Sequence, residues 1–379
     1  MTLSDIRAKA AVLSESDGFR VASLFLVNRL FLFGVGVMSV ILFTGLVEKP
    51  DVHIHSSEVW LQIWGSWDTG YFLATARHGY VVGGELCRFP LYPLAIKAVA
   101  LFVGNFFVAA LIVSNLALIL CCVLIYRLVA LEGPGPEARN ACKYLLLFPS
   151  SCILSGAFSE TLFLAVMLGS FYYARKRLWL LAGLLGMCAA LTRSIGCLVF
   201  LPLLYEYMRS REFRLRAVRP DVLWLLLVPA GTLLFFSYLY VLTGNFFAYA
   251  DSATREHFNV SFHNPFAIVH RLWFSFRYQS PDYFFNAALT ILSVVGLTVF
   301  IRKIGVTYWL LAMLLIFVPL MSTSWIVVMS RYLSVVFPLF LLAAKLAERP
   351  WLDEVMTIAF AIIQGFVMAM WVLDMHFIV

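Results

Sequence analysis

The chain has 379 residues, of which 62% are hydrophobic, 16% aromatic and only 13% charged. Soluble domains carry about 25% charged residues, and apolar runs of about 18 residues or more recur here, so the composition excludes a soluble enzyme and indicates an all-α polytopic membrane protein. The net charge of +7 does not indicate a nucleic-acid-binding protein, because the basic residues lie in short loops between apolar runs, where membrane topology explains them.

The first apolar run covers residues 21–47 and follows a polar N-terminal segment. It is longer than the ~7–15-residue apolar core of a signal peptide, so we expect it to remain as the first transmembrane helix. Residues 48–104 form the first outer loop. Within this loop, residues 90–104 are apolar but short and contain Lys97, which favours an interfacial helix over a membrane span.

The basic residues predict the orientation. Most of the 28 lysines and arginines fall in groups that we assign to the cytoplasm, together with the N-terminus, under the positive-inside rule. These groups lie at residues 7–20, 127–143, 175–177, 209–219, 302–303 and 345–349. Between them, further spans are expected at residues 105–126, 222–242, 283–301, 304–320, 332–344 and 355–373.

Two windows, residues 144–174 and 178–208, both begin and end beside cytoplasmic groups. Each must cross an even number of times, yet each is too short for two full crossings of ~20 residues. We expect two hairpins of short helices, with Glu160 and Arg193 at or near their turns, lining a polar cavity that opens to the outer side.

The resulting prediction is a single integral membrane domain over residues 1–379 with about 11 transmembrane helices. Residues 243–282 form a second large outer loop, and the C-terminus lies outside. No internal repeat is evident in the sequence. This disfavours a transporter, since many transporters are built from two related halves.

Four charged residues fall on the outer side of this topology: Asp68, Glu160, Arg193 and Arg331. Charge inside a bilayer usually marks function or pairing. A carboxylate can act as a general base towards a hydroxyl group, and arginine offers a planar fork for phosphate oxygens. Together they suit sugar transfer from a lipid-phosphate donor, with the arginines stabilising the departing phosphate.

Simpler readings stand beside this one. Asp68 could be a solvated residue of a turn, and Glu160 could serve only as the ion-pair partner of Arg193. Arg193 and Arg331 could both be structural, paired with carboxylates or helix ends. The aromatic residues between 60 and 80 favour an interfacial belt over a sugar platform.

A tightly bound metal ion or other cofactor is not expected. The spacing of His257, His263 and His270 suits no metal-binding helix turn or strand pair, and the seven cysteines have no metal-ligand spacing with histidine.

Several short motifs in order along residues 20–345 resemble the PIG-V family, which contains the second mannosyltransferase of glycosylphosphatidylinositol-anchor synthesis and its prokaryotic relatives. The first is Trp67-Asp68-Thr69-Gly70-Tyr71-Phe72-Leu73, followed by His78-Gly79-Tyr80 and Phe89-Pro90-Leu91-Tyr92-Pro93. The others are Phe148-Pro149 with Ser159-Glu160-Thr161-Leu162-Phe163, Leu191-Thr192-Arg193-Ser194, and Ser330-Arg331-Tyr332 with Phe337-Pro338-Leu339-Phe340.

This resemblance implies a GT-C glycosyltransferase fold with the catalytic acid in the first outer loop. It implies an inverting mannosyltransferase that uses a polyprenyl-phosphate sugar, such as dolichyl-phosphate mannose, and forms an α-glycosidic bond on a lipid-linked or glycan acceptor. Asp68 would be the base, and Arg193 and Arg331 the ligands of the donor phosphate. Further substrate contacts would come from Glu160, Tyr332, Tyr71, Tyr92 and Trp67.

The resemblance also implies a place and partners. The site would face the extracytoplasmic side of a bacterial or archaeal plasma membrane, or the lumen of the endoplasmic reticulum in a eukaryote, with an accessory membrane subunit as one partner besides the surrounding lipids. Two alternatives remain open: a polyprenyl-lipid carrier or flippase that grips phosphate without a base, and a structural subunit without chemistry.

Overall fold

A computed structural model describes residues 15–43, 54–82, 86–133, 135–255, 268, 273, 277, 280–322 and 328–375. Throughout these ranges the regular structure is helical, and no strand occurs in them. The first half of the described chain contains α2 (Glu15–Phe43), α3 (Val59–Gln62), α4 (Thr69–His78), α5 (Leu91–Val103), α6 (Phe106–Ala130), α7 (Gly135–Leu147), the 3₁₀ helix η2 (Ser151–Ser155), α8 (Glu160–Arg175) and α9 (Trp179–Thr192).

The second half begins with η3 (Ser194–Val199), α10 (Phe200–Ser210), η4 (Leu215–Ala217), η5 (Pro220–Leu226), α11 (Leu227–Thr243) and α12 (Ala248–Arg255). It continues with α14 (Pro281–Val299), α15 (Ile301–Ile304), α16 (Val306–Ser322), α17 (Met329–Leu333), α18 (Pro338–Leu346) and α19 (Pro350–Val372).

Membrane-spanning length is reached by five stretches in the part of the chain that the structure describes. They are Asp17–Phe43, Phe106–Ala130, Pro220–Thr243, Pro281–Val299 and Pro350–Val372. Large apolar side chains on the outward surface of these helices are exposed, such as Leu30 at 67% and Ile362 at 67%. Apolar surface of this kind is stable against lipid rather than water, so the protein is an integral membrane protein.

Each predicted span or hairpin arm overlaps a helix of the structure. The matching helices are α2, α6, α7, α8, α9, α10, α11, α14, α16, α18 and α19. Two differences stand out. The expected span at residues 332–344 is broken, because α17 ends at Leu333 and α18 begins only at Pro338. The first hairpin arm, α7, begins at Gly135, well before the predicted window.

The two hairpins form the centre of the molecule, where α8 packs between α6 and α9, and α9 packs on α11. Gly231 of α11 explains the last contact, because a Cβ atom there would lie 2.8 Å from the carbonyl oxygen of Met187 in α9. Small residues let membrane helices approach this closely. The core beneath them is strongly aromatic, with Phe163 and Phe171 of α8 fully buried.

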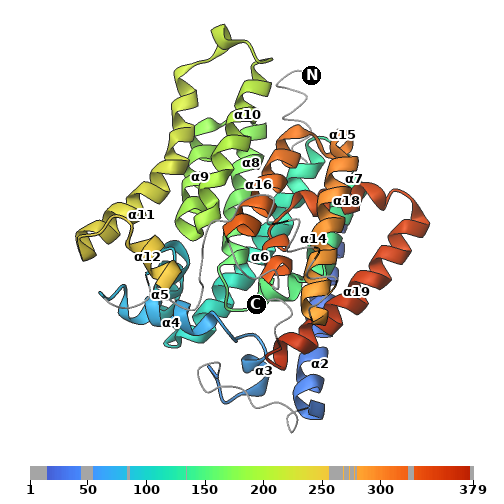
Figure 1. Ribbon diagram of the computed structural model, residues 1–379. Helices are drawn as coiled ribbons and strands as arrows, with labels where there is room; N and C mark the ends of the chain where they lie inside the picture. The colour runs from blue at the N-terminus through green and yellow to red at the C-terminus, as the bar shows by residue number, and fades with distance from the viewer. Residues whose placement is uncertain are drawn as a thin grey trace.

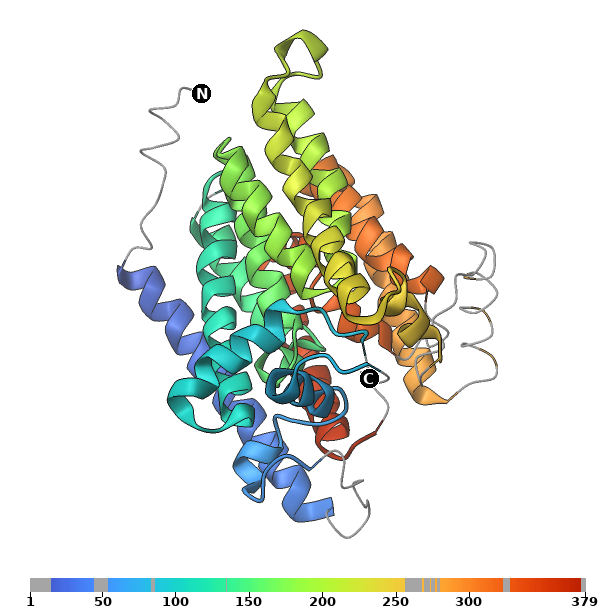
Figure 2. The ribbon, with the colours of Figure 1, turned by 90° about the vertical axis from the view of Figure 1, so that its left-hand side faces the viewer.

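The two ends of the helical assembly differ in composition. Figure 1 shows α3, α4, α5 and α12 at the lower end, whereas α15 and the turn between α10 and α11 lie at the upper end, and Figure 2 shows the same separation. That turn carries the basic group at residues 209–219, and α15 carries Arg302 and Lys303. The loop containing Asp68 therefore lies at the end opposite these basic groups, as the topology predicts.

Candidate active site

Asp68 lies immediately before α4, at the N-cap position, but its carboxylate makes no capping hydrogen bond. The residue before it, Trp67, has a φ of +50°. Bulky residues rarely adopt this left-handed backbone, and such strain is commonly found at functional sites. The Asp68 carboxylate is therefore not used to stabilise its own helix and points to partners elsewhere.

Long-range hydrogen bonds hold the strained loop in place. The backbone N–H of Ala157 donates to the carbonyl oxygen of Trp64 over 3.0 Å. The Ser66 hydroxyl donates to Oδ1 of Asp374 over 2.5 Å, beyond the end of α19. The loop is thereby tied both to the segment that leads into α8 and to the C-terminal helix.

Two arginines bind the Asp68 carboxylate. Nη1 of Arg331 lies 2.7 Å from Oδ2, and Nη2 of Arg88 lies 3.1 Å from Oδ1. Burial by itself would raise the pKa of Asp68, but the two guanidinium groups outweigh it and lower the pKa to about 2. Asp68 is thus ionised over the physiological range.

The pairing continues through Glu160, whose side chain is 0% exposed. Nε of Arg331 donates to Oε1 of Glu160, and Nη1 of Arg193 lies 2.6 Å from the same oxygen. Arg193 also donates to the Ser159 hydroxyl over 3.1 Å. Oε2 of Glu160 is buried and has no hydrogen-bond partner in the described chain.

Arg88, Asp68, Arg331, Glu160 and Arg193 therefore form one continuous array, called here the charged cluster. Its three arginines and two carboxylates leave a net positive charge. An aromatic ring lies near each guanidinium: Phe158 at 4.8 Å from Arg331, Tyr332 at 5.5 Å from Arg193 and Tyr71 at 4.9 Å from Arg88. Such rings stabilise cations that have lost water.

Helix ends position the members of the cluster. Glu160 is the first residue of α8, where the helix dipole favours a negative charge. Arg193 caps α9 with extended backbone before η3 begins. Arg331 lies in the short helix α17, just before the break that precedes α18. Within a membrane protein, irregular backbone of this kind is tolerated where it packs against protein or lines a polar cavity, rather than where it faces lipid.

The structure brings the predicted charged residues together, whereas only some of the predicted aromatic residues lie beside them. Tyr71 and Tyr332 flank arginines of the cluster, and Trp67 packs against the hydrophobic core next to Asp68. Tyr92 is 0% exposed, and its hydroxyl shares a 2.9 Å hydrogen bond with that of Ser114. Its polar group is therefore satisfied in the core, and a substrate contact from Tyr92 stays a prediction.

Sequence reasoning assigned no role to Arg88, which lies within the predicted first outer loop at residues 48–104. Its position directly before the Phe89-Pro90 motif, in the same loop as Asp68, was the available signal. Ser159 was noted in a motif but given no role, although its hydroxyl accepts a hydrogen bond from Arg193.

No cluster of three histidine, cysteine, aspartate or glutamate side chains suited to a metal ion occurs among the described residues. His257, His263 and His270 lie outside them. Both carboxylates of the charged cluster are paired with arginines.

No protein-family profile and no curated protein matches the chain. Among solved structures, ArnT from Cupriavidus metallidurans in the apo state matches with a TM-score of 0.54 and 14% identity, covering 88% of this chain and 60% of that chain. ArnT from Cupriavidus metallidurans bound to undecaprenyl phosphate matches with a TM-score of 0.54 and 11% identity, covering 93% of this chain and 76% of that chain.

The chain thus spans less than two thirds of the first ArnT structure. These matches define the fold: the protein is a polytopic membrane protein of the GT-C fold. At 14% and 11% identity the matches show the fold alone, and they do not show the PIG-V family.

Proposed function

We propose that the chain is an inverting glycosyltransferase that moves a sugar from a polyprenyl-phosphate donor to a lipid-linked or glycan acceptor. The observation that carries the proposal is the charged cluster. In it the Asp68 carboxylate, which does not cap α4, is paired with Arg88 and Arg331, two of the three arginines that meet there. The ArnT structure with bound undecaprenyl phosphate supports a donor of that lipid class.

The arginines have donors left for a phosphate. Arg331 uses Nε and Nη1 for the two carboxylates, which leaves Nη2. Arg193 uses Nη1 for Glu160 and Ser159, which leaves Nε and Nη2. A phosphate diester carries one negative charge and would balance the net positive charge of the cluster.

Donor binding would also prepare the base. A carboxylate with a pKa near 2 is a weak base while two arginines hold it. When phosphate oxygens bind the guanidinium of Arg331, the phosphate charge would offset the positive charge that this arginine presents to Asp68. The pKa of Asp68 would then rise towards its ordinary range, where proton transfer from a hydroxyl is easier.

The reaction then follows in one displacement. Asp68 accepts the proton of the acceptor hydroxyl as its oxygen attacks the anomeric carbon. The bond from that carbon to the phosphate oxygen breaks, and the polyprenyl phosphate leaves with the electron pair. Arg193 and Arg331 stabilise the charge that gathers on it. Attack from the opposite face converts a β-linked donor into an α-linked product.

Finer assignments rest on the sequence motifs. Mannose as the sugar, and a relationship to the PIG-V family, follow from the motifs around Asp68, Glu160, Arg193 and Arg331. An extracytoplasmic active site is supported by the position of α4, which Asp68 directly precedes, at the end opposite the basic loops. We treat residues 1–379 as one membrane domain, with residues 48–104 and 243–282 as its two large outer loops.

The test uses the purified full chain in proteoliposomes with undecaprenyl-phosphate mannose, radiolabelled in the sugar, and acceptor lipids extracted from membranes. Transfer of label to a new product that depends on Asp68 is the expected result. If the labelled donor crosses the bilayer while its sugar stays attached, the carrier alternative replaces the transferase.

A further inference from the structure

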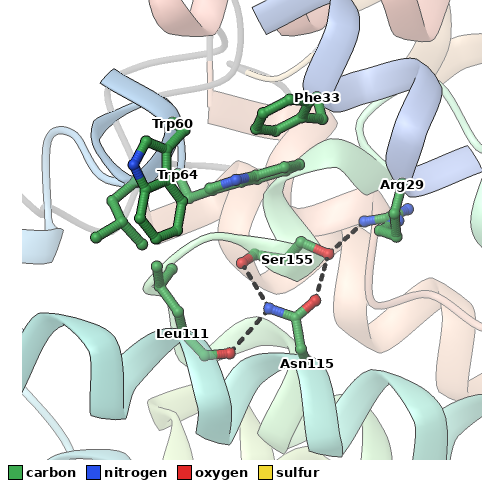
Figure 3. Close-up of a pocket in the computed structure, with 8 residues that line it drawn as sticks. Arg29, Phe33, Trp60, Trp64, Leu111, Asn115 and Ser155 are labelled. Atoms are coloured by element: carbon green, nitrogen blue, oxygen red, sulfur yellow. Dashed lines mark hydrogen bonds between the residues drawn. The ribbon is translucent and has the colours of Figure 1, made fainter. Parts of the chain in front are cut away.

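A second polar feature lies away from the charged cluster, between α2, α3, α6 and η2. It is a cavity of about 230 Å³. Figure 3 shows the rings of Phe33, Trp60 and Trp64 gathered beside the hydrogen-bonded side chains of Arg29, Ser155 and Asn115. None of the residues that line this cavity belongs to the charged cluster.

Arg29 is the charged member of this lining. Its Nη1 donates to the Ser155 hydroxyl and its Nη2 to Oδ1 of Asn28. Both acceptors are neutral, and Nε is buried without a hydrogen-bond partner in the described ranges of the chain. No carboxylate of the described residues pairs with Arg29, in contrast to Arg88, Arg193 and Arg331.

The neighbouring polar groups already satisfy one another. The Ser155 hydroxyl donates to Oδ1 of Asn115 over 2.9 Å. The Asn115 amide donates to the carbonyl oxygens of Leu111 at 2.8 Å and of Ser155 at 3.3 Å. The surroundings therefore offer Arg29 dipoles but no negative charge.

A purely structural role does not require the charge. Asn28 donates to Oε1 of Gln364 over 2.9 Å, and Gln364 donates to the carbonyl oxygen of Leu146 over 2.7 Å. Neutral amides thus already join α2 to α19 and α7. A guanidinium within a membrane-spanning helix is costly unless an anion accompanies it, so Arg29 indicates an anionic ligand.

We propose that this cavity binds the phosphate group of a membrane lipid at Arg29. The surface around it suits the rest of such a molecule. Leu26 and Leu30 of α2 are 59% and 67% exposed, so an acyl or prenyl chain can lie along the helix. Trp60, at 53% exposed, provides an indole at the mouth of the cavity. Guanidinium, aromatic ring and apolar helix surface together match a phosphate joined to a hydrocarbon chain.

The lipid site and the charged cluster share their supporting backbone. Trp64 and Asp68 belong to one loop, and Ser155 and Glu160 belong to the segment that the Ala157 hydrogen bond joins to it. The same two hydrogen-bonded segments therefore support both sites, although no side chain belongs to both.

The binding test uses tryptophan fluorescence. The full chain is placed in phosphatidylcholine nanodiscs, and phosphatidic acid with brominated acyl chains is titrated in, since bromine quenches a tryptophan that it touches. Saturable quenching is expected in the natural protein. Arg29→Gln should weaken the apparent affinity at least about tenfold through loss of a charge-assisted hydrogen bond.

Three variants complete the test. Arg77→Gln is the matched control, because Arg77 is exposed on α4 against the Phe106 ring, and it should bind like the natural protein. Arg29→Lys keeps the charge and should bind within a few-fold even if Arg29→Gln folds poorly. Trp60→Phe should lower the quenching amplitude without changing the midpoint.

Competition identifies the source of the phosphate. Displacement of the brominated lipid by undecaprenyl phosphate in preference to phosphatidic acid would assign a polyprenyl lipid, and equal displacement would assign a bilayer phospholipid. Inorganic phosphate at millimolar concentration should not compete. Full competition by inorganic phosphate, or unchanged quenching in Arg29→Gln, would overturn the proposal. The same titration on Asp68→Asn keeps this result independent of the proposed catalysis.

Discussion

Replacing Asp68 by asparagine is the sharpest test of the charged cluster, because the amide keeps the size of the side chain and removes its charge. The pKa of Asp68 lies near 2 instead of the usual 3.8 because Arg88 and Arg331 stabilise the ionised form. One pKa unit corresponds to about 1.4 kcal/mol. Asp68→Asn should therefore cost about 2 kcal/mol of stability at neutral pH.

The effect on catalysis should be larger. A positioned general base contributes roughly 10²–10⁴-fold to the rate, so sugar transfer by Asp68→Asn should fall by that factor while the lipid donor still binds. The assay follows label from undecaprenyl-phosphate mannose into product with purified protein, and thermal unfolding in the same detergent reports the stability change.

Asp282→Asn is the matched control. Asp282 lies in the first turn of α14 and accepts a hydrogen bond from Ser280, outside the charged cluster. The control should retain natural turnover. Turnover by Asp68→Asn within a few-fold of the natural protein would remove Asp68 from the role of base, whatever the change in stability.

Three further outcomes follow from the same geometry. Arg193→Ala and Arg331→Ala should each raise the KM for the lipid donor more than that for the acceptor, and equal effects in steady-state kinetics would contradict the phosphate assignment. Glu160→Gln should destabilise the fold by about 3–5 kcal/mol, because it leaves two buried guanidinium groups with less countercharge; an unchanged thermal midpoint would argue against this pairing. The stability that Asp68 adds should be complete above about pH 4 and decline as the pH falls towards 2, since its folded pKa lies below its unfolded one. Denaturation of the natural protein and Asp68→Asn across this pH range should converge at the acid end, and a constant difference would count against it.

The positions of most helices could be predicted from the sequence, because the requirement behind them is local. A backbone within lipid must satisfy its own hydrogen bonds, so an apolar run of sufficient length becomes a helix. The predicted span at residues 105–126 corresponds to α6, and that at residues 355–373 to α19. The turns at Glu160 and Arg193 also followed from the sequence, because their windows were too short for two full crossings.

The sequence was less informative about which side chains share a pocket. Tyr71 and Tyr92 belong to the same outer loop, yet Tyr71 lies against Arg88 and Tyr92 is enclosed in the core. No local pattern separates the two. The break before Pro338 was also missed. It follows α17, whose Arg331 pairs with Asp68, and this pairing depends on the packing of distant segments.

The sequence by itself determined that this is a helical membrane protein and which charged residues were candidates for its chemistry. The tertiary structure decided how they pair: Arg331 meets Asp68 from 263 positions away in the chain, and Arg88 joins them. It also left Arg29 in its cavity without a carboxylate partner among the residues that the structure describes. Hydropathy acts over one segment at a time, whereas ion pairing depends on where distant segments meet after packing.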